Sequence, residues 1–154
     1  MTSPGTKPLY LDDLYVGQRF TSAAYRMDAD EMKTFARQFD PQPFHLNEDA
    51  ARSSLFQGLA ASGWHTAAVA MRLIVLGGLP LAGGVIGLGA ELDWPQPTRA
   101  GDTLHVESEI IEIRPSRSKR NQAIVKVRSN VLNQNDEPVQ ILVAKLLVFK
   151  RPQD

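Results

Sequence analysis

The sequence contains no cysteine, which excludes a disulfide framework, a thiolate metal site and a cysteine nucleophile. It also lacks an uninterrupted run of about 20 apolar residues, the length that a membrane-spanning helix needs, and its first residues lack the pattern of a secretory signal. An excess of one charge is missing too, because 17 basic residues balance 17 acidic ones. We therefore expect a cytoplasmic protein with no membrane segment and no nucleic-acid partner.

What the chain does have is the size of one domain. It contains 154 residues, of which 43% are hydrophobic, enough for a proper core. We assign residues 1–154 to a single domain and expect residues 1–8 to form a flexible N-terminus.

The first half of the chain is predicted to be mainly helical. Asp28, in a capping-box pattern, can cap a helix over residues 29–38, and Asn47 can cap a short helix over residues 47–53. A third helix, over about residues 62–76, is apolar on nearly every face. Such a helix is expected inside the fold and not on its surface.

The second half changes to strand-like sequence. Strands are predicted over residues 85–92, 103–113, 123–132 and 139–149, separated by turn-forming segments, and one earlier strand over residues 19–27. These elements predict an α+β domain in which a curved antiparallel β-sheet wraps around a central apolar α-helix.

The most informative motif is Asp40-Pro41-Gln42-Pro43-Phe44-His45, which sets a carboxylate and an imidazole five residues apart. Each proline fixes its own φ and biases the preceding residue toward extended conformations, so the pair can be held rigidly. Ala61-Ser62-Gly63 then opens the apolar helix, whose N-terminus presents free N–H groups. By itself the motif leaves a structural role for Asp40 open, because an Asp before a Pro is most often a turn former.

Further motifs at Leu14-Tyr15-Val16-Gly17-Gln18, Trp94-Pro95-Gln96-Pro97, Gly101-Asp102 and Asn133-Gln134 complete a pattern that spans nearly the whole chain. Together the motifs resemble the MaoC-like dehydratase family, whose members are single hotdog domains that include (R)-specific enoyl-CoA hydratases. The resemblance implies a hotdog fold, a homodimer and an acyl-CoA or acyl carrier protein thioester as substrate. It implies no cofactor beyond the coenzyme A that forms part of the substrate.

The resemblance also assigns a catalytic dyad to Asp40 and His45, and an oxyanion-binding N–H to Gly63. The expected reaction adds water to a trans-2-enoyl-CoA to give a 3-hydroxyacyl-CoA, or removes it. A neutral imidazole can take a proton from water near neutral pH, and a carboxyl can deliver one to Cα. We therefore assign His45 to the water and Asp40 to Cα.

Two alternatives remain open at this stage. A thioesterase of the same fold would use the carboxylate to direct water at the thioester carbonyl. A non-catalytic subunit that binds acyl thioesters is also compatible, because Phe39 and Gln42 replace a glycine and an asparagine that many active members of the family carry.

Six further residues are predicted to contact the substrate. They are Gln42, Ser62, Trp64, Arg114, Arg117 and Arg120. Arginine binds phosphate through a planar fork, so the three arginines are candidates for the phosphates of coenzyme A, although a solvated hairpin face is the commoner meaning of such a cluster. Trp64 and Trp94 can line an acyl pocket or pack in the core.

The remaining histidines are interpreted as structural. His65 is expected to be a hydrogen-bonded core residue, and His105 a strand residue. Three separated histidines without clustered ligand spacing predict no metal site.

Overall fold

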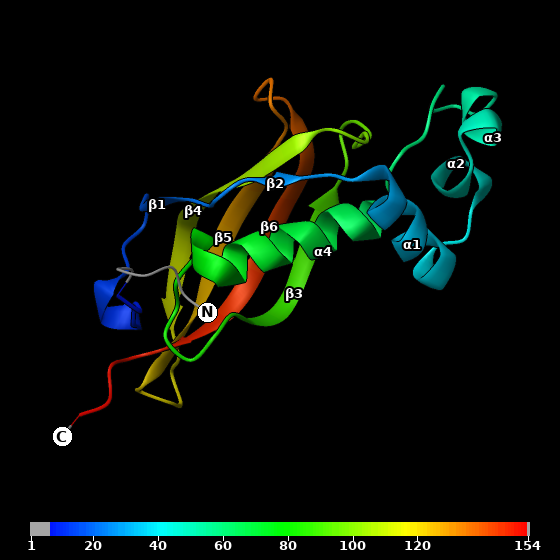
Figure 1. The fold of residues 1–154 in the computed structure, drawn as a ribbon. Coiled ribbons are helices and arrows are strands. Elements are labelled where there is room, and N and C mark those ends of the chain that lie inside the picture. The colour runs from blue at the N-terminus through cyan, green and yellow to red at the C-terminus, as the bar shows by residue number, and fades with distance from the viewer. Residues whose placement is uncertain (1–6, 154) are drawn as a thin grey trace.

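The computed structural model describes residues 7–153 and shows one antiparallel sheet with a long helix packed across it (Figure 1). The strands are β1 (Arg19–Thr21), β2 (Tyr25–Arg26), β3 (Ile86–Asp93), β4 (Thr103–Pro115), β5 (Gln122–Leu132) and β6 (Pro138–Phe149). The helices are η1 (Leu11–Asp13), α1 (Ala29–Phe39), α2 (Pro43–Leu46), α3 (Glu48–Arg52), α4 (Gly63–Leu73) and η2 (Ile74–Gly78), a π-helical turn that continues α4. Most of the expected flexible N-terminus lies outside the described residues.

The sheet confirms the four long strands predicted in the second half of the chain. Its order is β1-β4-β5-β6-β3, and β2 also pairs with β4. The strand predicted over residues 19–27 is instead two short strands, β1 and β2. Between them the Ser22 hydroxyl accepts the Val106 N–H at 2.7 Å, so a side chain takes the place of a backbone carbonyl and interrupts the ladder.

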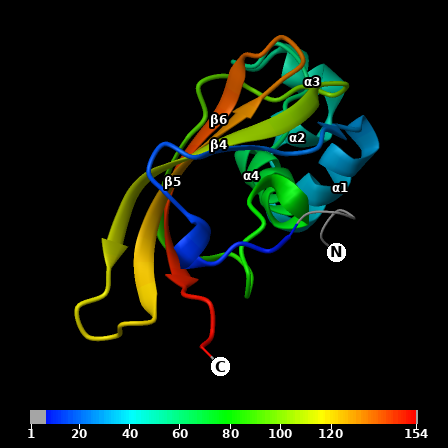
Figure 2. The same ribbon diagram turned by 90° about the vertical axis from the view of Figure 1, so that its left-hand side faces the viewer.

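The core lies between α4 and the sheet. Val69, Ala70 and Leu73 are buried on the inner face of α4. The prediction that this helix lies inside the fold is wrong for its other face, where Trp64 is 60% exposed and Met71 45% exposed. The reason is visible in Figure 2, where the sheet covers α4 from one side. Within residues 7–153 no helix has the length and apolar character needed to cross a membrane.

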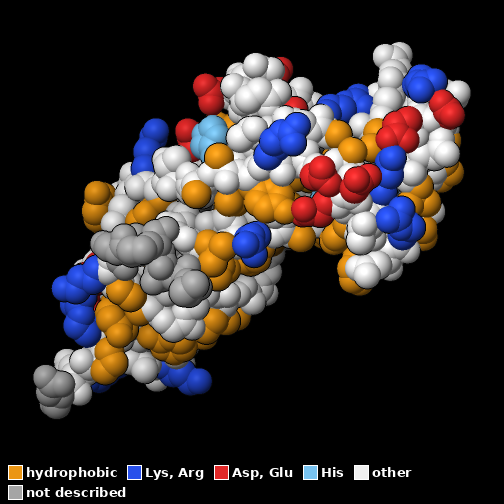
Figure 3. Space-filling model, viewed as in Figure 1, with side chains coloured by type: hydrophobic (Ala, Val, Ile, Leu, Met, Phe, Trp, Pro, Cys, Tyr) orange, Lys and Arg blue, Asp and Glu red, His pale blue; other side chains and the backbone are white. Residues whose placement is uncertain are grey.

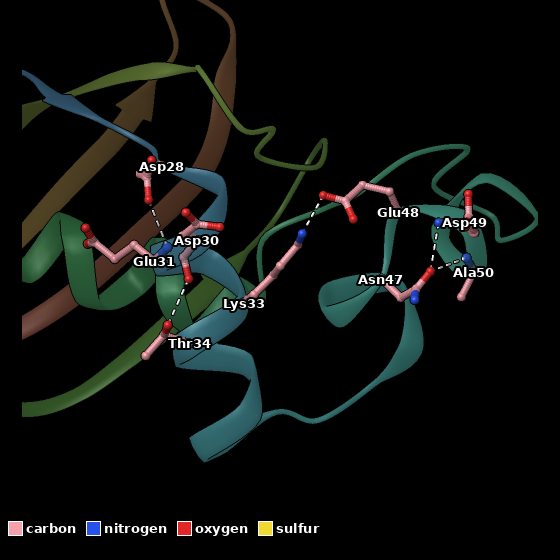
Figure 4. Close-up of polar contacts among 9 residues, drawn as sticks. All are labelled: Asp28, Asp30, Glu31, Lys33, Thr34, Asn47, Glu48, Asp49 and Ala50. Carbon is pink, nitrogen blue, oxygen red and sulfur yellow. Dashed lines mark hydrogen bonds and ion pairs between the residues drawn. The ribbon is translucent and has the colours of Figure 1, made fainter.

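The predicted helix caps are confirmed (Figure 4). Asp28 accepts the Glu31 N–H at 3.0 Å at the start of α1, and Asn47 accepts two N–H groups at the start of α3. The full capping box is absent, because the Glu31 side chain accepts a hydrogen bond from the Tyr25 hydroxyl instead. Acidic side chains gather over this end of α1 (Figure 3), where the helix dipole stabilises negative charge.

Candidate active site

The segment from Asp40 to His45 forms a helix cap and one helical turn. Asp40 caps the C-terminus of α1, its N–H donating to the carbonyl of Ala36 at 2.9 Å. Pro43 occupies the start of α2. The first N–H groups of a helix have no carbonyl partner within it, so the absence of an N–H in proline costs no hydrogen bond there. This turn, which the sequence analysis did not predict, carries His45 back toward Asp40. The Lys33–Glu48 ion pair, 2.5 Å between Nζ and Oε1, joins α1 to α3 across the segment (Figure 4).

The dyad predicted from the motif is close in space. Oδ2 of Asp40 lies 3.3 Å from Nε2 of His45, and Nδ1 of His45 lies 2.7 Å from the carbonyl oxygen of Ala60. A carbonyl can only accept, so Nδ1 carries the hydrogen and Nε2 of the neutral ring presents its lone pair to Asp40. Two facing acceptors at this distance can share a proton, or together accept the two hydrogens of one water that lies beside them.

The surroundings of Asp40 keep its carboxyl ionised. Burial raises the pKa of Asp40, but hydrogen bonds from the Ser62 hydroxyl and the Gln42 amide, with the adjacent His45, outweigh burial and leave the pKa below its usual value. The Gln42 Nε2–H donates to Oδ1 at 2.6 Å. Asp40 is therefore a carboxylate at neutral pH and can donate only a proton that it has first received.

Ser62 connects this carboxylate to the start of α4. It is fully buried, and its Oγ accepts the Trp64 N–H at 3.2 Å as the N-cap of α4. Gly63 follows as the first residue of α4, a position whose N–H has no carbonyl partner inside the helix and lies at its positive end. A Cβ at position 63 would lie 2.6 Å from the Trp94 ring, so the indole packs in this position only against a glycine.

The dyad borders a cavity of about 450 Å³. Most of the predicted site residues line it, namely Asp40, Gln42, His45, Gly63 and Trp64. Trp94 completes one wall, its ring edge-to-face with Trp64 at 5.3 Å between centroids. Ser62 does not line the cavity, but its buried hydroxyl stabilises the Asp40 carboxylate.

The three arginines lie elsewhere. Arg114 is near the end of β4, and Arg117 and Arg120 are in the turn to β5, at the opposite end of the sheet from α2 (Figure 1). Arg114 and Arg117 line a separate cavity. The structure of one chain therefore does not bring these arginines to its own dyad.

His65 is a core residue, but the expected hydrogen bond is absent. Its ring stacks on Phe35 at 4.8 Å between centroids, Nε2 is 3.9 Å from Oε1 of Glu31, and Nδ1 has no partner among the described residues. Burial lowers the pKa of His65, and the nearby Glu31 carboxylate opposes this shift in part. His105 lies on β4 with Nε2 3.3 Å from Glu107. Across residues 7–153 no cluster of three or more acidic or histidine side chains is arranged to hold a metal.

Sequence reasoning missed two contributors to this region. The Ala60 carbonyl, which orients His45, is a main-chain group and leaves no trace in the residue pattern. Gln140, which accepts the Trp94 indole N–H at 3.0 Å, was detectable as a lone amide in a strand that is otherwise largely apolar.

Comparisons with known proteins agree with this architecture. Residues 14–133 match the family model of the MaoC-like domain, and the chain belongs to this family. A MaoC-like dehydratase from Rhodospirillum rubrum is 60% identical, with a TM-score of 0.94 over 94% of this chain and 99% of that one. The (R)-hydratase PhaJ1 from Pseudomonas aeruginosa is 27% identical, with a TM-score of 0.74 over 94% of this chain and 88% of its own.

A curated relative is also similar. YdeM, an uncharacterized protein of Bacillus subtilis (strain 168), is 31% identical over 133 residues, which cover 84% of this chain and 91% of YdeM. The predicted family is thus confirmed, and the α+β sheet and helix form the hotdog fold of the solved MaoC-like structures.

Proposed function

We propose that this protein is a hydratase or dehydratase that interconverts a trans-2-enoyl thioester and a 3-hydroxyacyl thioester. The observation that carries the proposal is the Asp40 carboxylate 3.3 Å from Nε2 of His45, in a cavity that the first residue of α4 also lines. Membership of the MaoC-like family and similarity to an (R)-hydratase support it.

The proposed mechanism follows the protons. A water held by Asp40 and His45 gives a proton to Nε2 of His45 as its oxygen bonds to Cβ. The Gly63 N–H, at the positive end of α4, stabilises the enolate oxygen that forms on the thioester. Asp40 rests as a carboxylate, so it receives the proton from Nε2 and passes it to Cα. Hydroxyl and hydrogen then stand on Cβ and Cα, the dyad has regained its starting state, and dehydration is the reverse.

The test is the loss of enoyl absorbance with crotonyl-CoA and with a longer trans-2-enoyl-CoA. We expect turnover by the wild type and a loss of about 10³-fold in Asp40→Asn and in His45→Ala, whereas His105→Ala, the matched histidine control, should keep wild-type turnover. Release of a free thiol would instead identify a thioesterase. Binding of acyl-CoA without turnover of either substrate would contradict the proposed activity and identify a binding subunit.

We also propose that the protein is a homodimer. β3 is an edge strand that pairs with β6 alone among the described strands, and Ile86 and Leu88 on it are 38% and 55% exposed. Exposed apolar edges are normally covered in native proteins. Light scattering should give twice the 17.0 kDa chain mass, and a monomer at assay concentration would contradict the dimer.

In such a dimer, the turn between β4 and β5 of the second copy carries Arg117 and Arg120. This turn is the candidate binding site for the phosphates of coenzyme A. Arg117→Ala should then raise the KM for crotonyl-CoA and leave the KM for the crotonyl thioester of N-acetylcysteamine, which has no phosphate, unchanged. An equal change for both thioesters would contradict this role.

A further inference from the structure

The segment 56–59, between α3 and α4, leads directly into Ala60, whose carbonyl orients His45. It is irregular chain, and Gln57 within it has a φ of 55°, in the left-handed region that persists only where surrounding contacts hold it. Phe56 lines the dyad cavity, and its ring centroid lies 6.1 Å from that of His45. The position of this segment therefore affects both the proposed base and one wall of the cavity.

One side chain, Arg99, binds three carbonyl groups of the segment. Its Nη1 donates to the carbonyl oxygens of Gly58 at 2.9 Å and Leu59 at 3.2 Å, and its Nη2 donates to that of Phe56. A guanidinium offers several donors in one plane and no acceptor, so it can satisfy several carbonyls at once. Main-chain carbonyls need such partners wherever they are withdrawn from water.

Arg99 itself begins a turn that is held on both sides. Asp102 Oδ2 accepts the main-chain N–H of Arg99 at 2.8 Å, and its Oδ1 accepts a hydrogen bond from Nε2 of Gln134, in the turn between β5 and β6, at 3.0 Å. Gly101 donates its N–H to the carbonyl of Met27 at 2.7 Å, and its φ of 88° favours a glycine. The guanidinium therefore extends from a fixed point of the main chain to a segment that has no regular structure of its own.

The same turn reaches the peptide unit that contacts His45. The carbonyl of Ala60 and the N–H of Ala61 belong to one peptide unit, and this N–H donates to the carbonyl of Thr98 at 2.9 Å. Loss of the Arg99 side chain would remove three hydrogen bonds and leave the bond to Thr98 to hold the peptide unit in place.

We propose that Arg99 is a positioning residue for the dyad. It holds the chain from residue 56 to residue 61 beside residues 98–102, which keeps the Ala60 carbonyl against Nδ1 of His45 and leaves Nε2 without a hydrogen, ready to accept a proton. The inference rests on the proposed function in giving His45 the role of base. Arg99 does not line the dyad cavity, so its effect passes through the main chain and not through contact with the substrate.

The experiment measures the tautomer of His45 directly. Long-range ¹H–¹⁵N NMR spectra distinguish a ring nitrogen that carries a hydrogen from one that does not, and His45→Ala assigns the signals. The pH is raised until the shifts no longer change, so that neutral rings are compared. The wild type should carry the hydrogen on Nδ1. Arg99→Met, which keeps an unbranched stem and removes the guanidinium, should show a mixture of the two tautomers.

Turnover should follow the tautomer. In Arg99→Met, kcat for hydration of crotonyl-CoA should fall about tenfold, because a small misplacement of a catalytic group is costly. Arg99→Lys keeps the charge, but one ammonium cannot replace the two nitrogens that reach Phe56 and Leu59. Its tautomer mixture and its kcat should therefore lie between those of the wild type and Arg99→Met, and it replaces Arg99→Met in the test if that variant does not fold.

Arg151→Met is the matched control. It removes another guanidinium that joins distant parts of the chain, through a hydrogen bond of 2.8 Å from Nη2 to Asp13 of η1. This contact lies at the end of the molecule opposite α2 and α3 (Figure 1). The control should therefore keep both the wild-type tautomer and the wild-type kcat.

The proposal is overturned if the wild-type ring carries its hydrogen on Nε2, or if the Arg99 variant keeps the wild-type tautomer. It is also overturned if Arg151→Met changes the tautomer equally, or if kcat stays at the wild-type value while the tautomer changes. Turnover by the wild type with an unchanged tautomer in the variant rejects the role of Arg99 alone. A tautomer change in a protein whose wild type has no turnover rejects the hydratase and keeps Arg99 as the residue that orients His45.

Discussion

Two histidines of this protein are buried to the same degree and have opposite surroundings. His45 is 5% exposed and His65 is 4% exposed. His45 has a carbonyl at Nδ1 and a carboxylate at Nε2, and it borders a cavity. His65 has no partner at Nδ1 among the described residues, and only a carboxylate 3.9 Å away at Nε2. Burial alone therefore does not distinguish His45 from His65, whereas the groups that face the two ring nitrogens do.

The backbone explains the difference. His45 follows Pro43 on a single helical turn, which directs the ring back to Asp40 at the end of α1. His65 lies in the first turns of α4, where its ring stacks on Phe35 of α1. The first histidine is held by polar contacts and the second by packing, so substitutions at the two positions should have different consequences.

The largest effect should separate the two histidines directly. His45→Ala removes the proposed base and should lower kcat/KM by about 10³-fold, within the usual range for a general base. His65→Phe keeps a ring against Phe35, removes an unsatisfied nitrogen and should leave kcat/KM close to the wild-type value. Steady-state hydration of crotonyl-CoA is the measurement. Equal losses of kcat/KM in the two variants would show that His45 contributes no more to catalysis than His65 does.

Gly63, two residues before His65, offers the next largest effect. Gly63→Ala places a Cβ 2.6 Å from the Trp94 ring, so the indole or the start of α4 must shift. Displacement of the N–H proposed to bind the oxyanion should cost about 10²-fold in kcat. The double variant Gly63→Ala, Trp94→Leu should recover part of the loss, because the smaller side chain relieves the clash.

The control for this prediction is Gly58→Ala. A Cβ there would meet only the guanidinium of Arg99 at 3.4 Å, an ordinary contact, and kcat should change little. If Gly63→Ala and Gly58→Ala have the same activity, position 63 contributes nothing specific to the reaction.

Local patterns predicted the frame of this site and the Asp40–His45 pair, but not the contacts between segments far apart in the chain. Strand-favouring composition and the turn-forming segments between strands identified the long strands, and capping chemistry identified Asp28 and Asn47, because these signals arise between near neighbours in the chain. The hydrogen bond between Trp94 and Gln140 joins residues 46 apart, and no local rule predicts such a pair. The exposure of one face of α4 was not predicted. Apolar composition indicates that a face is normally covered, but it does not show whether the same chain covers it.

A smaller effect should come from Ser62, which supports Asp40 and caps α4. Ser62→Ala removes the cap and should lower the free energy of unfolding by ~1 kcal/mol. It also removes a contact that lowers the pKa of Asp40, so this pKa should rise, and an NMR titration of the Asp40 carboxyl carbon measures the change.

Asn47→Ala is the matched control for the cap. It removes the N-cap of α3 without touching Asp40, so it should lower stability and leave the pKa of Asp40 unchanged. A pKa shift of the same size in both variants would indicate that loss of stability, and not the contact between Ser62 and Asp40, changes the pKa.

The smallest effect concerns the pH dependence of stability and isolates His65. Burial lowers the pKa of His65 in the folded state, so the unfolded chain, in which a histidine titrates near ~6.5, binds more protons as the pH falls below that value. The free energy of unfolding should therefore be highest, as far as His65 is concerned, above the unfolded pKa. It should decline as the pH falls toward the folded pKa. Urea unfolding between pH 7 and pH 5 should show a smaller decline for His65→Phe than for the wild type. Parallel curves would mean that protonation of His65 does not contribute, because the only group that differs between the two proteins in this window is that imidazole.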